Sequence, residues 1–96
     1  MEKDSKEFSW EWVTGSLLLH RGPCELVCAY LVPAAATTDT VLYDGTDTAG
    51  RPIVTLKAAA VTGHPFKPPV PAYCRAGLYV SLSSNATGVF VQWRGL

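Results

Sequence analysis

The chain has 96 residues, of which 48% are apolar and 17% charged, and its eight basic and eight acidic residues cancel to a net charge of zero. A chain of this length holds one domain, and its scattered Lys and Arg lack the basic stripe that a nucleic-acid binder needs. Six of the sixteen charges lie in the first eleven residues. The rest of the chain is therefore poor in charge, which indicates a surface that packs against partners.

An extended N-terminal arm is predicted at residues 1–12, followed by a single β-sandwich domain at residues 13–96. The leader MEKDSKE has no secretory pattern, which predicts a protein made in the cytoplasm. The next stretch, FSWEW, places Phe8, Trp10 and Trp12 at alternate positions. In an extended chain the three rings point to one side, so the segment either contacts a neighbour or forms the first strand of the core. The sequence leaves both interpretations open.

Two strands are predicted next, at residues 13–20 and 24–32, because the dipeptide GP between them is a turn signal. The second strand, CELVCAYLV, is apolar on both faces, which indicates a central strand that is covered on both sides. Strict alternation puts Leu26, Cys28 and Tyr30 on one of these faces.

A further pair of strands is predicted at residues 37–43 and 53–59, on either side of the stretch DGTDTAG. Asp44 and Asp47 in this stretch raise the question of a calcium loop. A loop of the EF-hand type needs oxygen ligands at positions one, three and five and a glutamate at position twelve. Counted from Asp44, position twelve is Thr55. We therefore interpret the stretch as a turn, with side-chain hydrogen bonds from its aspartates.

The segment at residues 62–76, TGHPFKPPVPAYCRA, is predicted to be a loop because proline has no amide hydrogen to donate to a sheet. The last two apolar runs, GLYVSLS and VFVQW, alternate cleanly and are predicted to pair as an antiparallel hairpin. The side chains expected to face the core are Leu78, Val80, Leu82, Val89, Val91 and Trp93.

These runs add up to six or seven short strands with turn residues between them and no helical period. The pattern predicts an all-β fold, a small antiparallel β-sandwich that is jelly-roll-like, with a partly closed barrel as the alternative. The longest apolar stretch, LVCAYLVPAAA, is far shorter than the ~20 residues that cross a bilayer, so no membrane contact is expected.

The three cysteines are an odd number, which argues against a disulfide framework. Cys24 and Cys28 would lie about 13 Å apart in a strand, too far to bridge. A pair that includes Cys74 is open, but the favoured interpretation is small buried thiols in a reducing compartment. His20 and His64 do not follow the spacing of a zinc site. No catalytic, metal or cofactor-binding residue is predicted, and the chain is not expected to be an enzyme.

Several aromatic side chains are poorly explained by core positions, and such residues are enriched at protein interfaces. The candidate interface residues are Phe8, Trp10, Trp12, Phe66 and Tyr79.

Residues 26–93 resemble small all-β virion proteins of tailed bacteriophages. The stretches that carry the resemblance are LVCAYLV, then VLYDGTDTAGRPIVTL, and finally AGLYVSLSSNATGVFVQW. The resemblance implies a non-enzymatic structural protein of the capsid decoration (cement) type. Such a protein sits on the outer capsid as a homotrimer and bridges subunits of the major capsid protein. The alternatives are a phage tail or fibre-base component and a carbohydrate-binding β-sandwich module.

Overall fold

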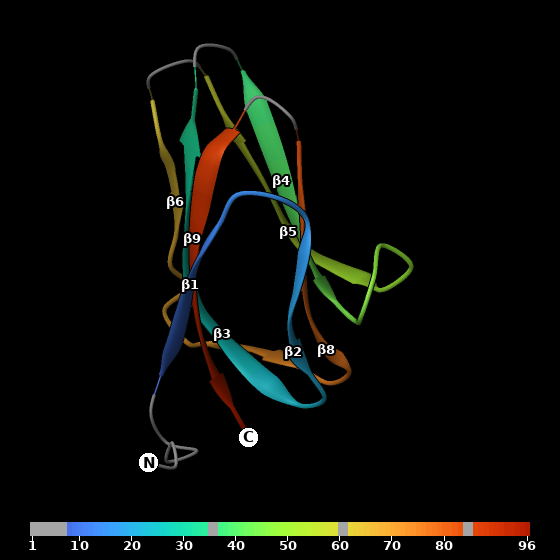
Figure 1. Cartoon of the computed structure of the whole chain (residues 1–96). Coiled ribbons are helices and arrows are strands. Elements are labelled where there is room, and N and C mark those ends of the chain that lie inside the picture. The colour runs from blue at the N-terminus through green and yellow to red at the C-terminus, as the bar shows by residue number, and fades with distance from the viewer. Residues whose placement is uncertain (1–7, 35–36, 60–61, 84–85) are drawn as a thin grey trace.

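The computed structural model describes residues 8–34, 37–59, 62–83 and 86–96. Within these residues the protein is all-β, with nine strands and no helix. The strands form two antiparallel sheets that pack face to face (Figure 1), which confirms the predicted β-sandwich.

The first sheet has the strand order β1 (Ser9–Val13), β9 (Ala86–Gly95), β3 (Cys24–Pro33) and β6 (His64–Phe66). The short strand β7 (Ala72–Cys74) also pairs with β3. One edge of β3 pairs with β9 along its whole length. The other edge pairs with β7 near the start of β3 and with β6 farther along it.

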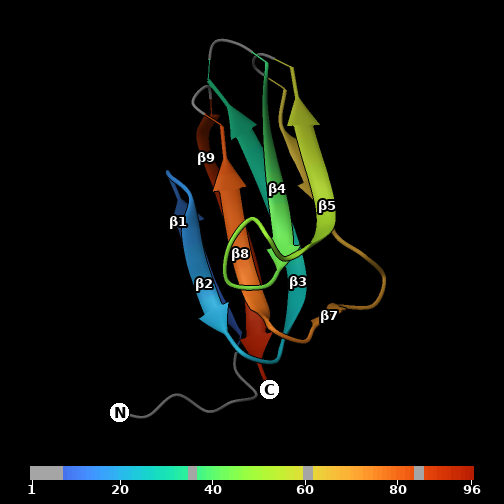
Figure 2. The ribbon, with the colours of Figure 1, turned by 90° about the vertical axis from the view of Figure 1, so that its right-hand side faces the viewer.

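The second sheet has the order β2 (Leu17–Arg21), β8 (Gly77–Leu82), β4 (Thr38–Asp44) and β5 (Arg51–Ala58). Figure 2 shows this sheet from its outer side, with the first sheet behind it. β4 and β5 pair as an antiparallel hairpin around the stretch that the sequence predicted to be a turn, and the loop between them projects from the sandwich.

The single strand predicted at residues 13–20 is wrong, because the structure has two strands there in different sheets. β1 ends at Val13 in the first sheet, and β2 begins at Leu17 in the second. The chain thus crosses between the layers over three residues, and Ser16 fixes the crossing because its Oγ accepts the backbone N–H of Leu82 at 3.0 Å. Thr14, Gly15 and Ser16 interrupt the apolar run between Val13 and Leu17. A short cluster of such residues is a turn signal, and the prediction of one continuous strand did not use it.

The predicted hairpin of the last two strands is also wrong. β8 pairs with β2 and β4, whereas β9 pairs with β1 and β3. The inward faces are as predicted: Leu78, Val80, Val89 and Val91 are fully buried, and Leu82 packs partly buried against them. Alternation determines which side of a strand faces the core, but the same pattern suits a hairpin and a crossing between sheets.

The proline-rich segment contains two short strands rather than being loop throughout. β6 and β7 each have three residues and lie at the edge of the first sheet, and Pro65 sits opposite Tyr30 there. Proline is tolerated at a sheet edge because its missing N–H would point away from the ladder.

A β-bulge in β3 changes which side chains face the core. The register runs from Leu26–Trp93 directly to Cys28–Gln92, so Val27 is the extra residue. Leu26 is buried before the bulge, but the strand is out of phase after it, and Tyr30 is 43% exposed. The predicted shared face of Leu26, Cys28 and Tyr30 is therefore wrong, because a bulge inverts the alternation.

The core lies between the two sheets and is almost entirely aliphatic. Each fully buried Leu or Val contributes about 1.5–3 kcal/mol relative to an exposed position. The buried apolar residues are Val13, Cys24, Leu26, Ala29, Leu31, Leu42, Leu56, Ala58, Cys74, Leu78, Val80, Val89, Val91 and Trp93. In the part of the chain that the structure describes, no helix has the length and hydropathy to cross a membrane.

Candidate functional site

The outer face of the first sheet carries a group of aromatic side chains. Trp10 and Trp12 alternate with Glu11 along β1, and Phe8 precedes them in the same phase. Their exposed fractions are 63% for Trp10, 42% for Trp12 and 48% for Phe8. The last residues of the predicted arm are therefore a sheet strand, while residues 1–7 lie outside the described residues.

Two further rings from neighbouring strands extend this group. In the register of the sheet, Trp12 of β1 pairs with Phe90 of β9, and Phe90 pairs with Tyr30 of β3. The three rings thus form one row across three adjacent strands. We call Phe8, Trp10, Trp12, Tyr30 and Phe90 the aromatic face.

Close contacts hold these rings against the sheet. The Trp10 and Phe90 rings stack with centroids 6.0 Å apart and planes 27° apart. Trp12 covers Gly88, where a Cβ atom would lie only 2.5 Å from Trp12 Cζ2. Tyr30 covers Gly63 in the same way. The glycines leave room for the rings to lie close to the backbone, so the face is packed and still exposed.

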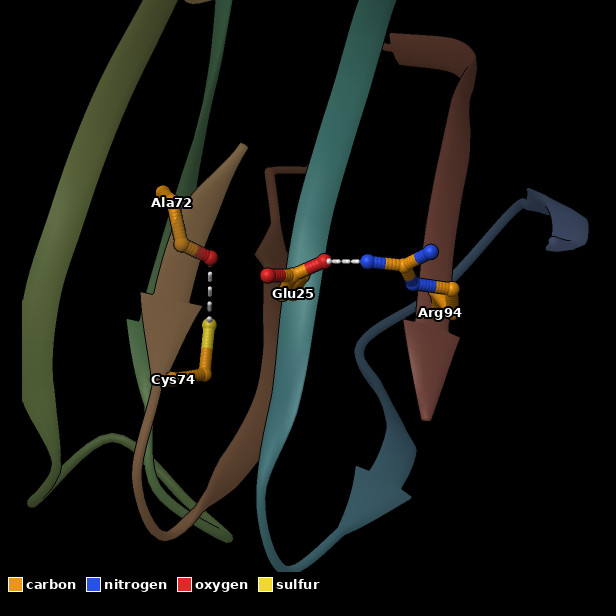
Figure 3. Close-up of polar contacts among 4 residues, drawn as sticks. All are labelled: Glu25, Ala72, Cys74 and Arg94. Atoms are coloured by element: carbon orange, nitrogen blue, oxygen red, sulfur yellow. Dashed lines mark hydrogen bonds and ion pairs between the residues drawn. The ribbon is translucent and has the colours of Figure 1, made fainter. Parts of the chain in front are cut away.

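A charged pair borders the aromatic face at one end. Arg94 of β9 donates to Glu25 Oε1 of β3 at 2.5 Å, and Figure 3 shows the two side chains reaching toward each other between the strands. The Arg94 guanidinium also lies over the Phe8 ring, 5.5 Å from its centroid. An ion pair as exposed as this one contributes less than about 1 kcal/mol, but together with the cation–π contact it holds Phe8 at the border of the face.

The five candidate interface residues do not all meet. Phe8, Trp10 and Trp12 share the aromatic face, as their alternation predicted. Tyr79 lies on the outer side of the second sheet, where its ring is 6.4 Å from that of Tyr43. These two tyrosines are therefore on the opposite surface of the sandwich.

Phe66 is partly buried and does not lie on the aromatic face. It pairs with Ala29, whose side chain points inward, and it packs against the buried cluster. The residues that the sequence missed are Tyr30 and Phe90. The strand is apolar on both faces, so its sequence does not indicate the bulge before Tyr30. Strict alternation therefore placed Tyr30 on the wrong side.

The stretch DGTDTAG is a turn, as predicted, and its aspartates bind backbone groups. Asp47 Oδ1 accepts the N–H of Ala49 at 2.9 Å within the turn. Asp44 reaches across to another loop and accepts the N–H groups of Arg75 at 3.0 Å and Ala76 at 2.8 Å. It thereby ties the end of β4 to the turn between β7 and β8.

The surroundings of Asp44 lower the pKa of its carboxyl below the ordinary value of 3.8. Partial desolvation acts to raise this pKa, but the N–H groups of Ala76, Arg75 and Gly77 and the charge of Arg75 together outweigh it. Hydrogen bonds to the ionised form explain the direction.

The remaining polar groups are dispersed. His20 is in β2 and His64 in β6, at edges of different sheets, and His64 Nδ1 lies 2.7 Å from the backbone O of Lys57. Among the described residues, no three His, Cys, Asp or Glu side chains come together in a way that could hold a metal ion.

Two open pockets are lined by described residues. One, of about 300 Å³, is lined by Asp44, Arg51, Tyr73, Arg75 and Ala76. The other, of about 230 Å³, is lined by Thr37, Thr38, Asp39, Lys57 and Ser83. Neither pocket brings a nucleophile next to a histidine, the pairing on which the common form of nucleophilic catalysis depends. The aromatic face is the more prominent feature of the described surface.

Comparison with known proteins gave no match of this chain to a family model, to a curated protein or to a solved structure.

Proposed function

We propose that this chain is a non-enzymatic structural protein that assembles through its aromatic face. The observation that supports the proposal is the exposure of Phe8, Trp10, Trp12 and Tyr30, each between 42% and 63%, on one side of one sheet. Contiguous exposed apolar surface marks interaction sites in small proteins. Aromatic rings are also the residues that dominate interface energies. The net charge of zero leaves little repulsion between copies.

The proposed assembly is a homotrimer. Copies related by a threefold axis meet through two different patches, because only a twofold axis joins a surface to itself. The aromatic face of one copy would then cover another surface of the next copy. Leu17 of the edge strand β2 is 43% exposed and pairs with the inward-facing Val80, so it offers apolar area at the edge of the second sheet and not on the outer side that carries Tyr79.

We propose capsid decoration as the setting of this assembly. The trimer would sit on the outer capsid of a virion, after synthesis in the host cytoplasm, and bridge subunits of the major capsid protein. The resemblance of residues 26–93 to small virion proteins of tailed bacteriophages supports this role, as does the charge-poor body of the chain. Each copy would add a modest contact, which the symmetry of the shell repeats many times.

The experiment that tests the assembly is light scattering of the purified full-length chain over a dilution series. The expected mass is three times the 10.3 kDa of one chain. The double variant Trp10→Ser, Trp12→Ser should be a folded monomer, while Tyr79→Ser, on the opposite surface, should assemble like the unmodified chain. A monomer at all concentrations would contradict the proposed trimer.

The decoration role has its own test, in which the assembled chain is mixed with expanded, genome-free capsids of tailed phages that lack their own decoration protein. We expect the unmodified chain to sediment together with the capsids. We also expect capsids that carry the chain to open at a higher temperature than capsids without it. Recovery of the chain only in the supernatant, from all shells, would contradict the role.

Carbohydrate binding is a second candidate, because the exposed rings of Trp10, Trp12 and Tyr30 lie on the outer face of one sheet. Aromatic rings of this kind can stack on the apolar side of a sugar. A glycan array probed with the full-length chain separates the two functions. Binding that disappears in the Trp10→Ser, Trp12→Ser variant would favour the sugar site over the structural role.

A further inference from the structure

Two of the three cysteines lie directly opposite each other in the first sheet. Cys24 of β3 and Cys74 of β7 are paired positions of the antiparallel ladder, and both side chains are 0% exposed. Directly opposite residues in such a ladder have Cα atoms about 4.5–5.5 Å apart. A disulfide spans Cα distances of about 4.4–6.8 Å, so the backbone of this pair already has the spacing of a disulfide.

The two thiols also interact with each other. A hydrogen bond between them raises the pKa of Cys24, and burial and the charge of Cys74 raise it further. The same hydrogen bond lowers the pKa of Cys74, whose thiol lies 3.7 Å from the carbonyl oxygen of Ala72 (Figure 3). Cys74 is therefore the thiol of the pair that ionises first.

The third cysteine is separate from this pair. Cys28 follows the bulge and is only half-buried, and its Sγ lies 3.6 Å from Gln92 Oε1. It pairs with Gln92 across the sheet and not with a cysteine.

A reagent would reach the buried pair when β7 opens locally. This strand has three residues and in the described chain pairs only with β3. Its central residue Tyr73 is 59% exposed, and Val70, two residues before the strand, is 74% exposed. Short, exposed edge segments open locally at low free energy. The surface pocket of about 300 Å³ is lined by Tyr73 and Arg75, the residues on either side of Cys74 in the chain.

We propose that Cys24 and Cys74 form the oxidation site of this protein and close to an intrachain disulfide by exchange with a low-molecular-weight disulfide. The Cys74 thiolate attacks one sulfur of the small disulfide, forms a mixed disulfide and releases one small thiolate. The Cys24 thiolate then attacks the Cys74 sulfur and releases the second small thiolate. Two electrons pass from the protein thiols to the small disulfide, and the two protons end on the released thiols.

The new bond would fasten β7 to β3 and close the chain between residues 24 and 74 into a loop. Closing a long loop restricts the unfolded chain, so the oxidised protein should unfold at a higher urea concentration than the reduced protein.

The test uses the full-length folded chain and oxidised glutathione as the probe. After incubation, the protein is acid-quenched, alkylated under denaturing conditions, weighed and mapped by mass spectrometry. The expected result is the loss of two of the three alkylatable thiols, with no glutathione retained, a Cys24–Cys74 link and an alkylated Cys28. A reducing agent should restore all three thiols and the lower urea midpoint.

Cys28→Ser is the matched variant, and it should form the same link and keep no alkylatable thiol. Cys74→Ser should form no intrachain link. If Cys74→Ser does not fold, the link mapped in the unmodified chain and in Cys28→Ser decides the question. A link that involves Cys28, a covalent dimer, a persistent glutathione adduct or three unreacted thiols would overturn the proposal.

Discussion

The substitution Asp44→Asn tests how the turn after β4 is joined to the rest of the sandwich. The carboxylate accepts the N–H of Arg75 at 3.0 Å with one oxygen and that of Ala76 at 2.8 Å with the other. Asparagine keeps one acceptor but places an NH₂ group against the second N–H donor. A hydrogen bond to a charged group contributes about 1.5–3 kcal/mol, and the partial exposure of the site favours the lower part of that range.

We therefore expect Asp44→Asn to lower the free energy of unfolding by about 2 kcal/mol at neutral pH. For a domain of this size each kcal/mol shifts the melting temperature by about 4–8 °C, so the melting temperature should fall by about 8–16 °C. Urea unfolding followed by tryptophan fluorescence measures the free energy. Asp47→Asn is the matched control, because Asp47 accepts one N–H within its own turn and should lose less than about 0.5 kcal/mol.

The pH dependence has a definite sign. The pKa of Asp44 is lower in the folded chain than its ordinary value of 3.8, so the folded state binds the proton more weakly than the unfolded state. The stabilisation is therefore complete above pH ~4 and is lost as the pH falls through the folded pKa. The difference in the free energy of unfolding between the unmodified chain and Asp44→Asn should therefore decrease steadily below pH ~4. A difference in unfolding free energy under about 0.5 kcal/mol at pH 7, or a difference that stays constant down to pH ~2, would refute this reasoning.

Two glycine substitutions compare a position that faces backbone atoms, Gly77, with one that faces a side-chain ring, Gly88. Gly77→Ala places a Cβ atom 2.7 Å from the backbone O of His20 and 2.8 Å from that of Gly45, so we expect a loss of about 3 kcal/mol in urea unfolding. A loss below about 1 kcal/mol would contradict the close approach of these loops. The Cβ atom of Gly88→Ala has the Trp12 ring as its nearest contact, at 2.5 Å. Because an exposed ring can move, we expect a loss of about 1 kcal/mol with a change in tryptophan emission. An unchanged emission spectrum would mean that Trp12 does not cover Gly88.

The sequence predicted the fold class and most inward positions, because alternation is a local property of each strand. It also predicted that Phe8, Trp10 and Trp12 share one face. The pairing of strands could not be predicted in the same way. The alternating patterns of β8 and β9 fit a hairpin within one sheet as well as two strands in different sheets.

The site was only partly predictable for the same reason. Tyr30 joins Trp12 and Phe90 only because of the bulge at Val27, and a bulge in a strand that is apolar on both faces leaves no sequence signal. Phe66 was predicted as an interface residue because the neighbouring prolines suggested a loop. In the structure it belongs to the edge strand β6, and its ring packs partly buried against the core.

The central claim is that the aromatic face is the surface through which copies of this chain assemble. The most direct measurement is hydroxyl-radical footprinting of the full-length chain above and below the concentration at which it assembles. The account predicts that oxidation of Trp10 and Trp12 falls several-fold on assembly, while oxidation of Tyr79 on the opposite sheet stays the same. Equal oxidation of Trp10 and Trp12 in both states, or protection of Tyr79 alone, would contradict it.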